Sequence, residues 1–130
     1  MKDRTEYIYI QKEDHIWEKV LLEDIYYIET LKSTHYCQIK YKEGVGKIRA
    51  DITPLYQEFS PWLFRTKAST LANLNQVQKV DIRNRLLYFD QDIYCSYAQR
   101  VAGEIKTRLR IKNYRNYGGG ENEQSAETSI

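Results

Sequence analysis

The sequence predicts a mainly β fold, in which short antiparallel strands form small sheets accompanied by one short central helix and one C-terminal helix. Tyrosine is unusually frequent, with 12 tyrosines against three phenylalanines and two tryptophans. Tyrosine and the β-branched residues cluster in short runs, which is typical of half-buried strands. Polar and glycine-containing turns separate these runs, and only two stretches carry the signals of a helix.

The length of 130 residues favours one domain, large enough to bury a core without disulfides or metals. We expect residues 1–112 to form this domain and residues 113–130, which are polar and acidic, to be a disordered tail. The tail has one arginine and three glutamates, a net charge of −2, whereas the whole chain carries +2. Residues 1–112 therefore carry +4, which is compatible with nucleic acid as a partner.

The first half of the chain alternates strands with tight turns. Five strands are predicted, at residues 6–11, 15–21, 25–29, 36–41 and 47–50. Residues 22–24 are expected to form one turn of helix, and 43–46 a glycine turn. The strand 25–29 is apolar on both faces, whereas 36–41 alternates, with Cys37, Ile39 and Tyr41 on one face.

The second half contains both predicted helices. Thr53 and Pro54 are expected to open the central helix as N-cap and first residue, and Ser60–Pro61 to end it. A hairpin is predicted from residues 78–83 and 86–90, followed by a turn into a strand at 93–95. Ser96 is expected to cap the final helix, predicted over 97–112.

Three stretches carry a recognisable pattern. The longest runs from Leu63 to Val77 and contains a phenylalanine, an arginine, a serine and an apolar run that ends in asparagine. The second is Leu22–Glu29, and the third is Ser96–Tyr97 before the final helix. In this order and spacing they resemble the signatures of the LytTR family of bacterial DNA-binding domains, over about residues 5–110. Phe64, Arg65, Ser69, Leu71 and Asn73 fit the family pattern, whereas Lys67 and Ala68 depart from it.

The resemblance implies that the polar loop Lys32-Ser33-Thr34-His35 contacts DNA. His35 can donate a hydrogen bond to a base acceptor such as guanine N7, and Lys32 and Ser33 suit the backbone and its phosphates. Composition alone would describe the same segment as an ordinary solvated hairpin loop.

A second candidate contact comprises Arg65, Lys67 and Ser69. Arg65 and Ser69 suit phosphates, and base readout shifts to Lys67 because Ala68 can only pack against a thymine methyl group. The alternative for Arg65 is a structural ion pair, for example with Glu29. Asn73 is expected to satisfy backbone groups at the end of a strand.

The third candidate contact comprises Ser96, Gln99 and Arg100. The family commonly has arginines directly after this serine, where Tyr97 and Ala98 stand here. A helix N-terminus can bind a phosphate through its free N–H groups, and Gln99 or Arg100 could contact a base. The alternative is that Arg100 is only a solvated helix residue.

The expected function is that of a sequence-specific, bacterial, response-regulator-like transcription factor acting on double-stranded DNA in the cytoplasm. Because few arginines occupy base-reading positions, we expect self-association of two copies on direct repeats in promoters. Met1 lies only a few residues before the first strand, so we expect the domain to stand alone, without a receiver, or to be a fragment. The resemblance also allows a small membrane regulatory protein as a partner.

The alternative function is that of a protein-interaction module that keeps the fold without specific DNA binding. It is suggested by Ala68, Tyr97 and Ala98, which stand where the family commonly has DNA-contacting residues. An enzyme is not expected, because His15 and His35 lie in separate turns and no serine or cysteine is paired with either. No cofactor, metal or small-molecule substrate is expected. Cys37 and Cys95 are expected to be free, half-buried thiols in a reducing compartment.

Overall fold

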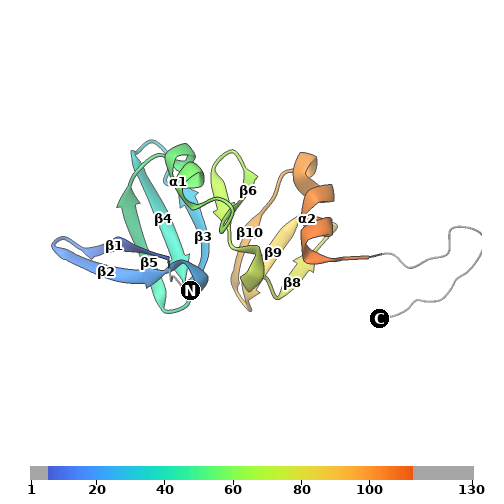
Figure 1. Ribbon diagram of the computed structural model, residues 1–130, viewed down its shortest axis with the longest axis horizontal. Coiled ribbons are helices and arrows are strands. Elements are labelled where there is room, and N and C mark those ends of the chain that lie inside the picture. Colours follow the sequence, from blue (N-terminus) through green and yellow to red (C-terminus); the bar gives the residue numbers. More distant parts are fainter. Residues whose placement is uncertain (1–5, 113–130) are drawn as a thin grey trace, which may run out of the picture.

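Two antiparallel sheets and two helices make up the fold in the computed structural model, which describes residues 6–112 (Figure 1). The larger sheet has the strand order β2-β1-β5-β4-β3-β7-β6, formed by β1 (Tyr7–Glu13), β2 (Ile16–Leu21), β3 (Ile25–Thr30), β4 (Tyr36–Tyr41), β5 (Gly44–Arg49), β6 (Phe64–Lys67) and β7 (Thr70–Ala72). The smaller sheet has the order β10-β9-β8, formed by β8 (Lys79–Asp81), β9 (Leu86–Asp90) and β10 (Ile93–Ser96). The helices are α1 (Ile52–Phe59) and α2 (Ala102–Leu109), with 3-10 turns η1 (Leu22–Asp24), η2 (Leu74–Gln76) and η3 (Gln99–Val101). The predicted mainly β fold is confirmed, while the predicted tail 113–130 lies outside the described residues.

Neither helix of the described part of the chain has the length and apolar character needed to cross a membrane.

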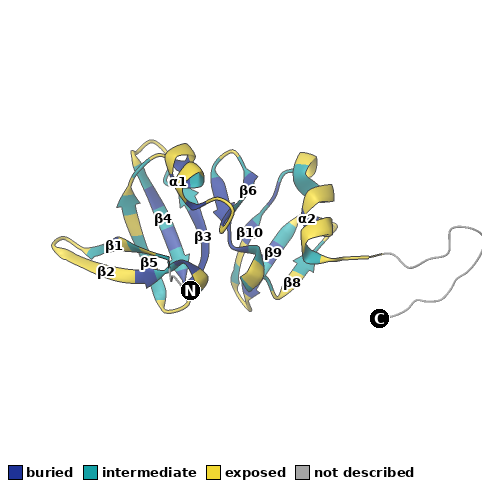
Figure 2. Cartoon of the chain, in the orientation of Figure 1, coloured by how far each residue is buried: buried dark blue, intermediate teal, exposed yellow. Residues whose placement is uncertain are grey.

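The third strand is buried on both faces, as its sequence predicts. Figure 2 shows β3 buried along most of its length, whereas β2 at the sheet edge is largely exposed. The ladder between β3 and β4 pairs Ile25 with Tyr41 and Tyr27 with Lys40, so Tyr26 is an extra residue on β3. This β-bulge breaks the alternation of faces. As a result Ile25 and Ile28 belong to one core, and Tyr26 and Tyr27 belong to another.

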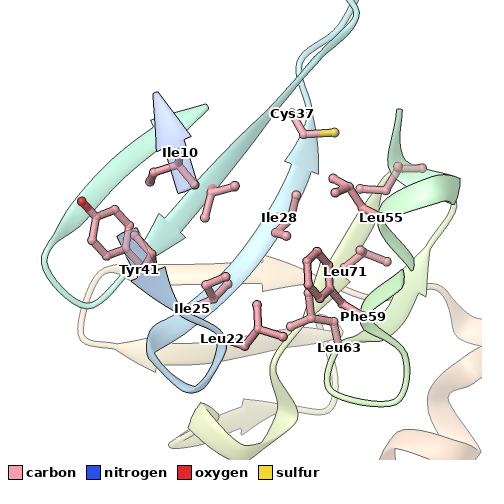
Figure 3. Packing of buried hydrophobic residues seen from close by; sticks show 13 residues of the cluster. Ile10, Leu22, Ile25, Ile28, Cys37, Tyr41, Leu55, Phe59, Leu63 and Leu71 are labelled. Carbon is pink, nitrogen blue, oxygen red and sulfur yellow. The ribbon is translucent and has the colours of Figure 1, made fainter. Parts of the chain in front are cut away.

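The first core lies between the larger sheet and α1 (Figure 3). Its side chains come from β1 to β4, from η1, from α1, from the segment between α1 and β6, and from β7. Ten are labelled in the figure: Ile10, Leu22, Ile25, Ile28, Cys37, Tyr41, Leu55, Phe59, Leu63 and Leu71. On β4 the predicted alternation is confirmed, because Cys37, Ile39 and Tyr41 are buried while the residues between them are only partly so.

The second core joins the two sheets and α2. Tyr26 stacks on Phe89 with ring centres 5.3 Å apart, and Tyr27 lies 5.8 Å from the same ring. Ile105 of α2 is completely buried in this core, with Val101 and Leu109 packed around it as their spacing of four predicts. The larger sheet, the smaller sheet and α2 therefore share one apolar cluster.

Both cysteines are free, as predicted, but they are fully buried rather than half-buried. Cys37 belongs to the first core and its thiol donates to the carbonyl of Ala50 at 3.3 Å. Cys95 belongs to the second core, and burial raises the pKa of its thiol to about 12. A thiol that stays protonated at neutral pH is a poor nucleophile, so Cys95 acts as a small core residue.

The central helix starts earlier than predicted. Asp51 takes the N-cap position and α1 begins at Ile52, so Thr53 and Pro54 are its second and third residues rather than its cap and first residue. A proline is tolerated there because the first N–H groups of a helix have no partner within the helix. Burial of Ile52 against the first core draws the chain into the helix two residues early.

The final helix starts later than predicted, and Ser96 is not its cap. Ser96 ends β10, and the backbone N–H groups of Tyr97 and Ala98 donate to the carbonyls of Arg85 and Thr66 at 3.1 and 2.9 Å. These bonds keep the chain extended beyond β10. After η3, α2 spans only Ala102–Leu109.

The predicted glycine turn at 43–46 is also displaced, because the turn comprises Lys42 and Glu43, and β5 already begins at Gly44. Gly46 lies against β1, where an added Cβ atom would come 2.6 Å from Ile10 Cδ1 and 3.0 Å from the carbonyl oxygen of Gln11. The glycine is therefore required by close packing within the sheet.

Replacing Gly46 with alanine is expected to lower the free energy of unfolding by about 1–3 kcal/mol, because a fully buried isoleucine and a strand backbone must move. Chemical denaturation measures the change. Gly103→Ala is the matched control, since a Cβ at this helical position meets nothing within 4 Å. It is expected to raise stability by up to about 1 kcal/mol. Equal effects of the two substitutions would contradict this packing.

Candidate nucleic-acid interface

Three hydrogen bonds join the three polar segments that the sequence singles out. The backbone N–H of Thr30, the last residue of β3 before the β3–β4 loop, donates to the carbonyl of Ser69 at 3.0 Å. Lys67 Nζ donates to Ser96 Oγ at 2.8 Å, linking β6 to β10. The N–H of Ala98 donates to the carbonyl of Thr66 at 2.9 Å. Figure 1 shows the β3–β4 loop, the β6–β7 turn and the start of α2 along the same upper edge of the molecule.

The β3–β4 loop is a closed, hydrogen-bonded turn. Thr34 donates its backbone N–H and its hydroxyl to the carbonyl of Leu31 at 3.2 and 2.8 Å, and its hydroxyl accepts from the N–H of Tyr36 at 3.0 Å. Ser33 takes a left-handed conformation with φ 65°. Because Thr34 is used in forming the loop, the side chains of Lys32, Ser33 and His35 are left exposed to solvent.

His35 lies beside the start of α1. Its Nδ1 is 3.8 Å from Asp51 Oδ1, and its side chain is 77% exposed. Arg49 lines the same shallow depression as His35, and its guanidinium lies 5.8 Å from the ring centre of Tyr36. Sequence reasoning missed Arg49, although its alternation with the partly buried Ile48 on a strand indicates an outward-facing side chain.

A second β-bulge shapes the β6–β7 hairpin. Arg65 pairs with Leu71 and Lys67 pairs with Thr70, so Thr66 is the extra residue on β6. Thr66 is completely buried, and its hydroxyl donates to the carbonyl of Thr70 at 3.4 Å. Its own carbonyl is the acceptor for Ala98. The bulge thus connects the hairpin to the segment that leads into η3.

Arg65 stabilises the turn of this hairpin. Its Nη2 donates to the carbonyl of Ala68 at 2.8 Å, and its guanidinium lies 5.8 Å from the ring centre of Tyr56. No ion pair with Glu29 forms, because the Glu29 carboxylate accepts instead from the Thr70 hydroxyl at 3.4 Å. Arg65 is half-buried, and its Nη2 is already used in a hydrogen bond within the fold.

Lys67, Ser69 and Ser96 are also half-buried. The Ser69 hydroxyl lies 3.4 Å from that of Thr70, and Ser96 receives the ammonium of Lys67. The helix N-terminus expected at Ser96 is absent from this position because α2 begins only at Ala102. Any contact of Ser96 with a phosphate would depend on its hydroxyl and on its neighbour Lys67, not on a helix end.

Gln99 and Arg100 are exposed on η3. Arg100 and Arg65 line one cavity of about 270 Å³, together with Glu104 and Arg108 of α2. Sequence reasoning missed this role of Arg108. The spacing of Glu104 and Arg108 by four was the available signal, and the two side chains do form an ion pair at 3.0 Å.

Asn73 is buried, and it is used within the fold as predicted. Its Nδ2 donates to the carbonyls of Leu22 and Glu23 at 3.3 and 3.4 Å, and its Oδ1 accepts from the N–H of Asn75 at 3.1 Å. The side chain thereby joins the end of β7 to η1. This asparagine, although part of the sequence signature, is not available to DNA.

The described residues 6–112 contain no group of three or more histidine, cysteine, aspartate or glutamate side chains placed to bind a metal ion. The chemistry of the edge is that of hydrogen-bond donors and cations, which suits an anionic, base-bearing partner.

The model of the LytTr DNA-binding domain family matches residues 16–110. The chain belongs to the LytTR family. It is therefore a DNA-binding domain, and DNA is its partner.

A solved LytTr DNA-binding domain of a response regulator from Bacillus cereus has the same fold. It is 18% identical, with a TM-score of 0.65 over 80% of this chain and 96% of that one. No curated protein matches the sequence. At this identity the similarity supports the fold of the LytTR chain and does not extend to individual side-chain contacts.

Replacing Asn73 with alanine is expected to lower the free energy of unfolding by about 1–3 kcal/mol, because it leaves buried backbone groups without partners. Chemical denaturation measures the loss. Asn75→Ala, at the exposed neighbour, should change stability by less than about 0.5 kcal/mol. If the two substitutions cost the same, the structural role of Asn73 is wrong.

Proposed function

We propose that this LytTR domain regulates transcription by recognising a specific DNA sequence in promoters, with the joined polar edge inserted in and beside a major groove. The single observation that supports this is the continuity of the edge, in which three segments distant in sequence are joined by backbone and side-chain hydrogen bonds. A continuous edge can present all three segments to one groove at the same time.

The exposure of the side chains suggests a division of tasks. His35, Gln99 and Arg100 are exposed and carry donors that can reach base edges. Lys32 and Ser33 extend the loop towards the DNA backbone, where a cation and a hydroxyl suit phosphates.

The β6–β7 turn lies between these two groups of side chains. Ala68 is exposed at the turn and can pack against a thymine methyl group. Four further candidates are half-buried and already bonded within the fold: Arg65, Lys67, Ser69 and Ser96. Each can contact DNA only through donors or acceptors that these internal bonds leave unused.

Few free donors remain for bases, so one copy is expected to bind weakly. We propose that two copies bind direct repeats and associate on the DNA, because a contact between neighbouring bound copies raises the effective concentration of the second copy. A small membrane regulatory protein remains a predicted partner.

His35→Ala and Arg100→Ala are each expected to weaken specific DNA binding by about 1–3 kcal/mol, because each removes an exposed donor to bases. A gel-shift titration against duplexes from the region upstream of the chain's own gene measures the loss. Lys19→Ala is the matched control, since Lys19 is an exposed cation on β2 at the opposite end of the larger sheet. It should change affinity little.

The same titration at two salt concentrations separates this function from the alternative function. Saturable binding that weakens steeply with salt supports the DNA-binding regulator. Absent or salt-insensitive binding supports a protein-interaction module, which the partial engagement of Arg65 and Lys67 within the fold would favour. Equal losses for Lys19→Ala and Arg100→Ala would contradict the proposed interface.

Paired binding predicts a dependence on the spacing of the repeats. Inserting 5 base pairs between two bound repeats is expected to abolish paired binding, because it turns the second site to the opposite face of the duplex. Inserting about 10 base pairs should restore it, since one helical turn is about 10.5 base pairs. Gel shifts on the three duplexes measure this, and identical affinities for all three would contradict the paired arrangement.

A further inference from the structure

The outer four strands of the larger sheet, β2, β1, β5 and β4, have one face turned away from the first core. Residues directly opposite each other in a ladder point to the same side of a sheet, so the register identifies this face. Tyr9 is paired with Lys19 on β2. Gln11 is paired with Trp17 on β2 and with Lys47 on β5. We call this surface the open face; its residues alternate along the strands with those of the first core.

Three large aromatic side chains on the open face have about half of their surface exposed. Tyr7, Tyr9 and Trp17 are 49%, 51% and 50% exposed. The rings of Tyr7 and Tyr9 lie 6.1 Å apart with their planes at 83°, so they meet edge to face and do not stack on one another. Each ring therefore keeps surface on which a planar ligand can stack. Single exposed aromatic residues are ordinary, but three on one hairpin form a patch.

The open face is also cationic. Its charged side chains are all basic: Lys19, Lys40, Lys47 and Arg49. Within residues 6–112 none of them forms an ion pair. Glu18, the one acid of β2, lies on the other face of the sheet, where its carboxylate accepts from the Tyr41 hydroxyl at 3.0 Å. The open face therefore complements a polyanion.

Contacts with tyrosine rings position these cations. Lys19 Nζ lies 4.3 Å from the ring centre of Tyr7, and Lys47 Nζ lies 4.8 Å from that of Tyr36. The Arg49 guanidinium lies 5.8 Å from the same Tyr36 ring. These cation–π contacts hold the charges beside the exposed rings. A cation held next to a stacking surface can pair with a phosphate while the attached base lies on the ring.

We propose that the open face binds single-stranded nucleic acid, with bases stacked on Tyr7, Tyr9 and Trp17 and phosphates paired with the cations. Every base has a planar face, so such a platform accepts many sequences. A sheet can bind in this way because stacking requires an exposed ring and not a pocket. An acidic peptide would match the cations, but it offers fewer flat rings to the three aromatic residues.

The open face is distinct from the polar edge, and this inference does not rest on the proposed function. Figure 1 shows β1 and β2 at the end of the molecule away from α2. In a duplex the bases are paired and stacked on one another, so rings on a flat sheet do not reach them. One chain can therefore bind a duplex along the polar edge and a single strand on the open face. Such a chain would hold RNA, or a strand of unwound DNA, beside its duplex site.

Fluorescently labelled octamers of uridine and of thymidine are the probes, and their anisotropy measures affinity for the full chain. Saturable binding is expected, and the tighter of the two identifies RNA or DNA as the ligand. Tyr9→Leu and Trp17→Leu are each expected to weaken binding about tenfold, because leucine cannot stack on a base. Tyr94→Leu is the matched control, since Tyr94 is 49% exposed on β10 of the smaller sheet. It should change the affinity little.

Two results of this titration would overturn the inference. Equal losses for Tyr9→Leu, Trp17→Leu and Tyr94→Leu would show that the open face is not the site. Absence of binding by both octamers would exclude a single strand as the occupant and leave the face to an acidic protein.

The salt dependence tests the cations. Lys19→Gln combined with Lys47→Gln is expected to lower the slope of log affinity against log salt by about 1.4, at about 0.7 for each phosphate contact on a single strand. The control of equal net charge is Lys79→Gln combined with Lys106→Gln, which changes two exposed lysines elsewhere. Lys79 likewise lies over a tyrosine, 4.5 Å from the ring centre of Tyr88. Equal slopes for the two double variants would contradict the phosphate contacts.

Backbone amide chemical shifts in the ¹⁵N-labelled chain locate the single strand. The octamer is expected to shift the amides of β1, β2 and β5, and a bound duplex should not reverse these shifts. If the octamer shifts only the polar edge, or is displaced by the duplex, the inference fails. If the octamer binds the open face while no duplex binds, the proposed function fails and this inference stands.

Discussion

The strand β3 is the structural element on which the rest of this domain depends. It is buried on both faces, and the bulge at Tyr26 gives each face a different set of side chains. Ile25 and Ile28 complete the first core, while Tyr26 and Tyr27 pack on Phe89 of the smaller sheet. A regular strand would have placed one tyrosine in each core. The bulge is what allows one strand to bind two layers together.

The polar edge follows from this arrangement. The carbonyl of Tyr26 accepts from the N–H of Asn73, and the N–H of Thr30 donates to Ser69, so both ends of β7 are fixed to β3. The hairpin β6–β7 is in turn bonded to the chain leaving β10 through Thr66 and Ala98. The three polar segments are therefore fixed relative to one another by the same contacts that hold the two cores together.

Much of this fold could be predicted from local patterns. The alternation on β4 and the apolar run of β3 each depend on neighbouring residues only. The position of Asn73 at the end of a predicted strand likewise indicated its role in satisfying backbone groups. The bulges were not predictable, because an extra residue such as Thr66 is defined by its partner strand and not by its own sequence.

The sequence indicated which residues belong to the candidate site, but it did not indicate which of them contact one another. Lys67 and Ser96 were both candidates, yet their contact joins positions 29 residues apart, and no local pattern encodes it. The start of α2 was misplaced because Tyr97 and Ala98 resemble the first turn of a helix by sequence, while distant carbonyls draw them into an extended chain. The cavity with Arg108 arises only when α2 packs beside β6.

The central claim is that the β3–β4 loop, the β6–β7 turn and η3 act as one surface. The most direct measurement is the perturbation of backbone amide chemical shifts in the ¹⁵N-labelled domain on titration with a duplex that it binds. The account predicts that the amides of residues 32–35, 68–69 and 98–100 shift together with one binding curve, while those of β1 and β2 do not. Shifts confined to a single segment, or centred on the β1–β2 hairpin, would contradict it.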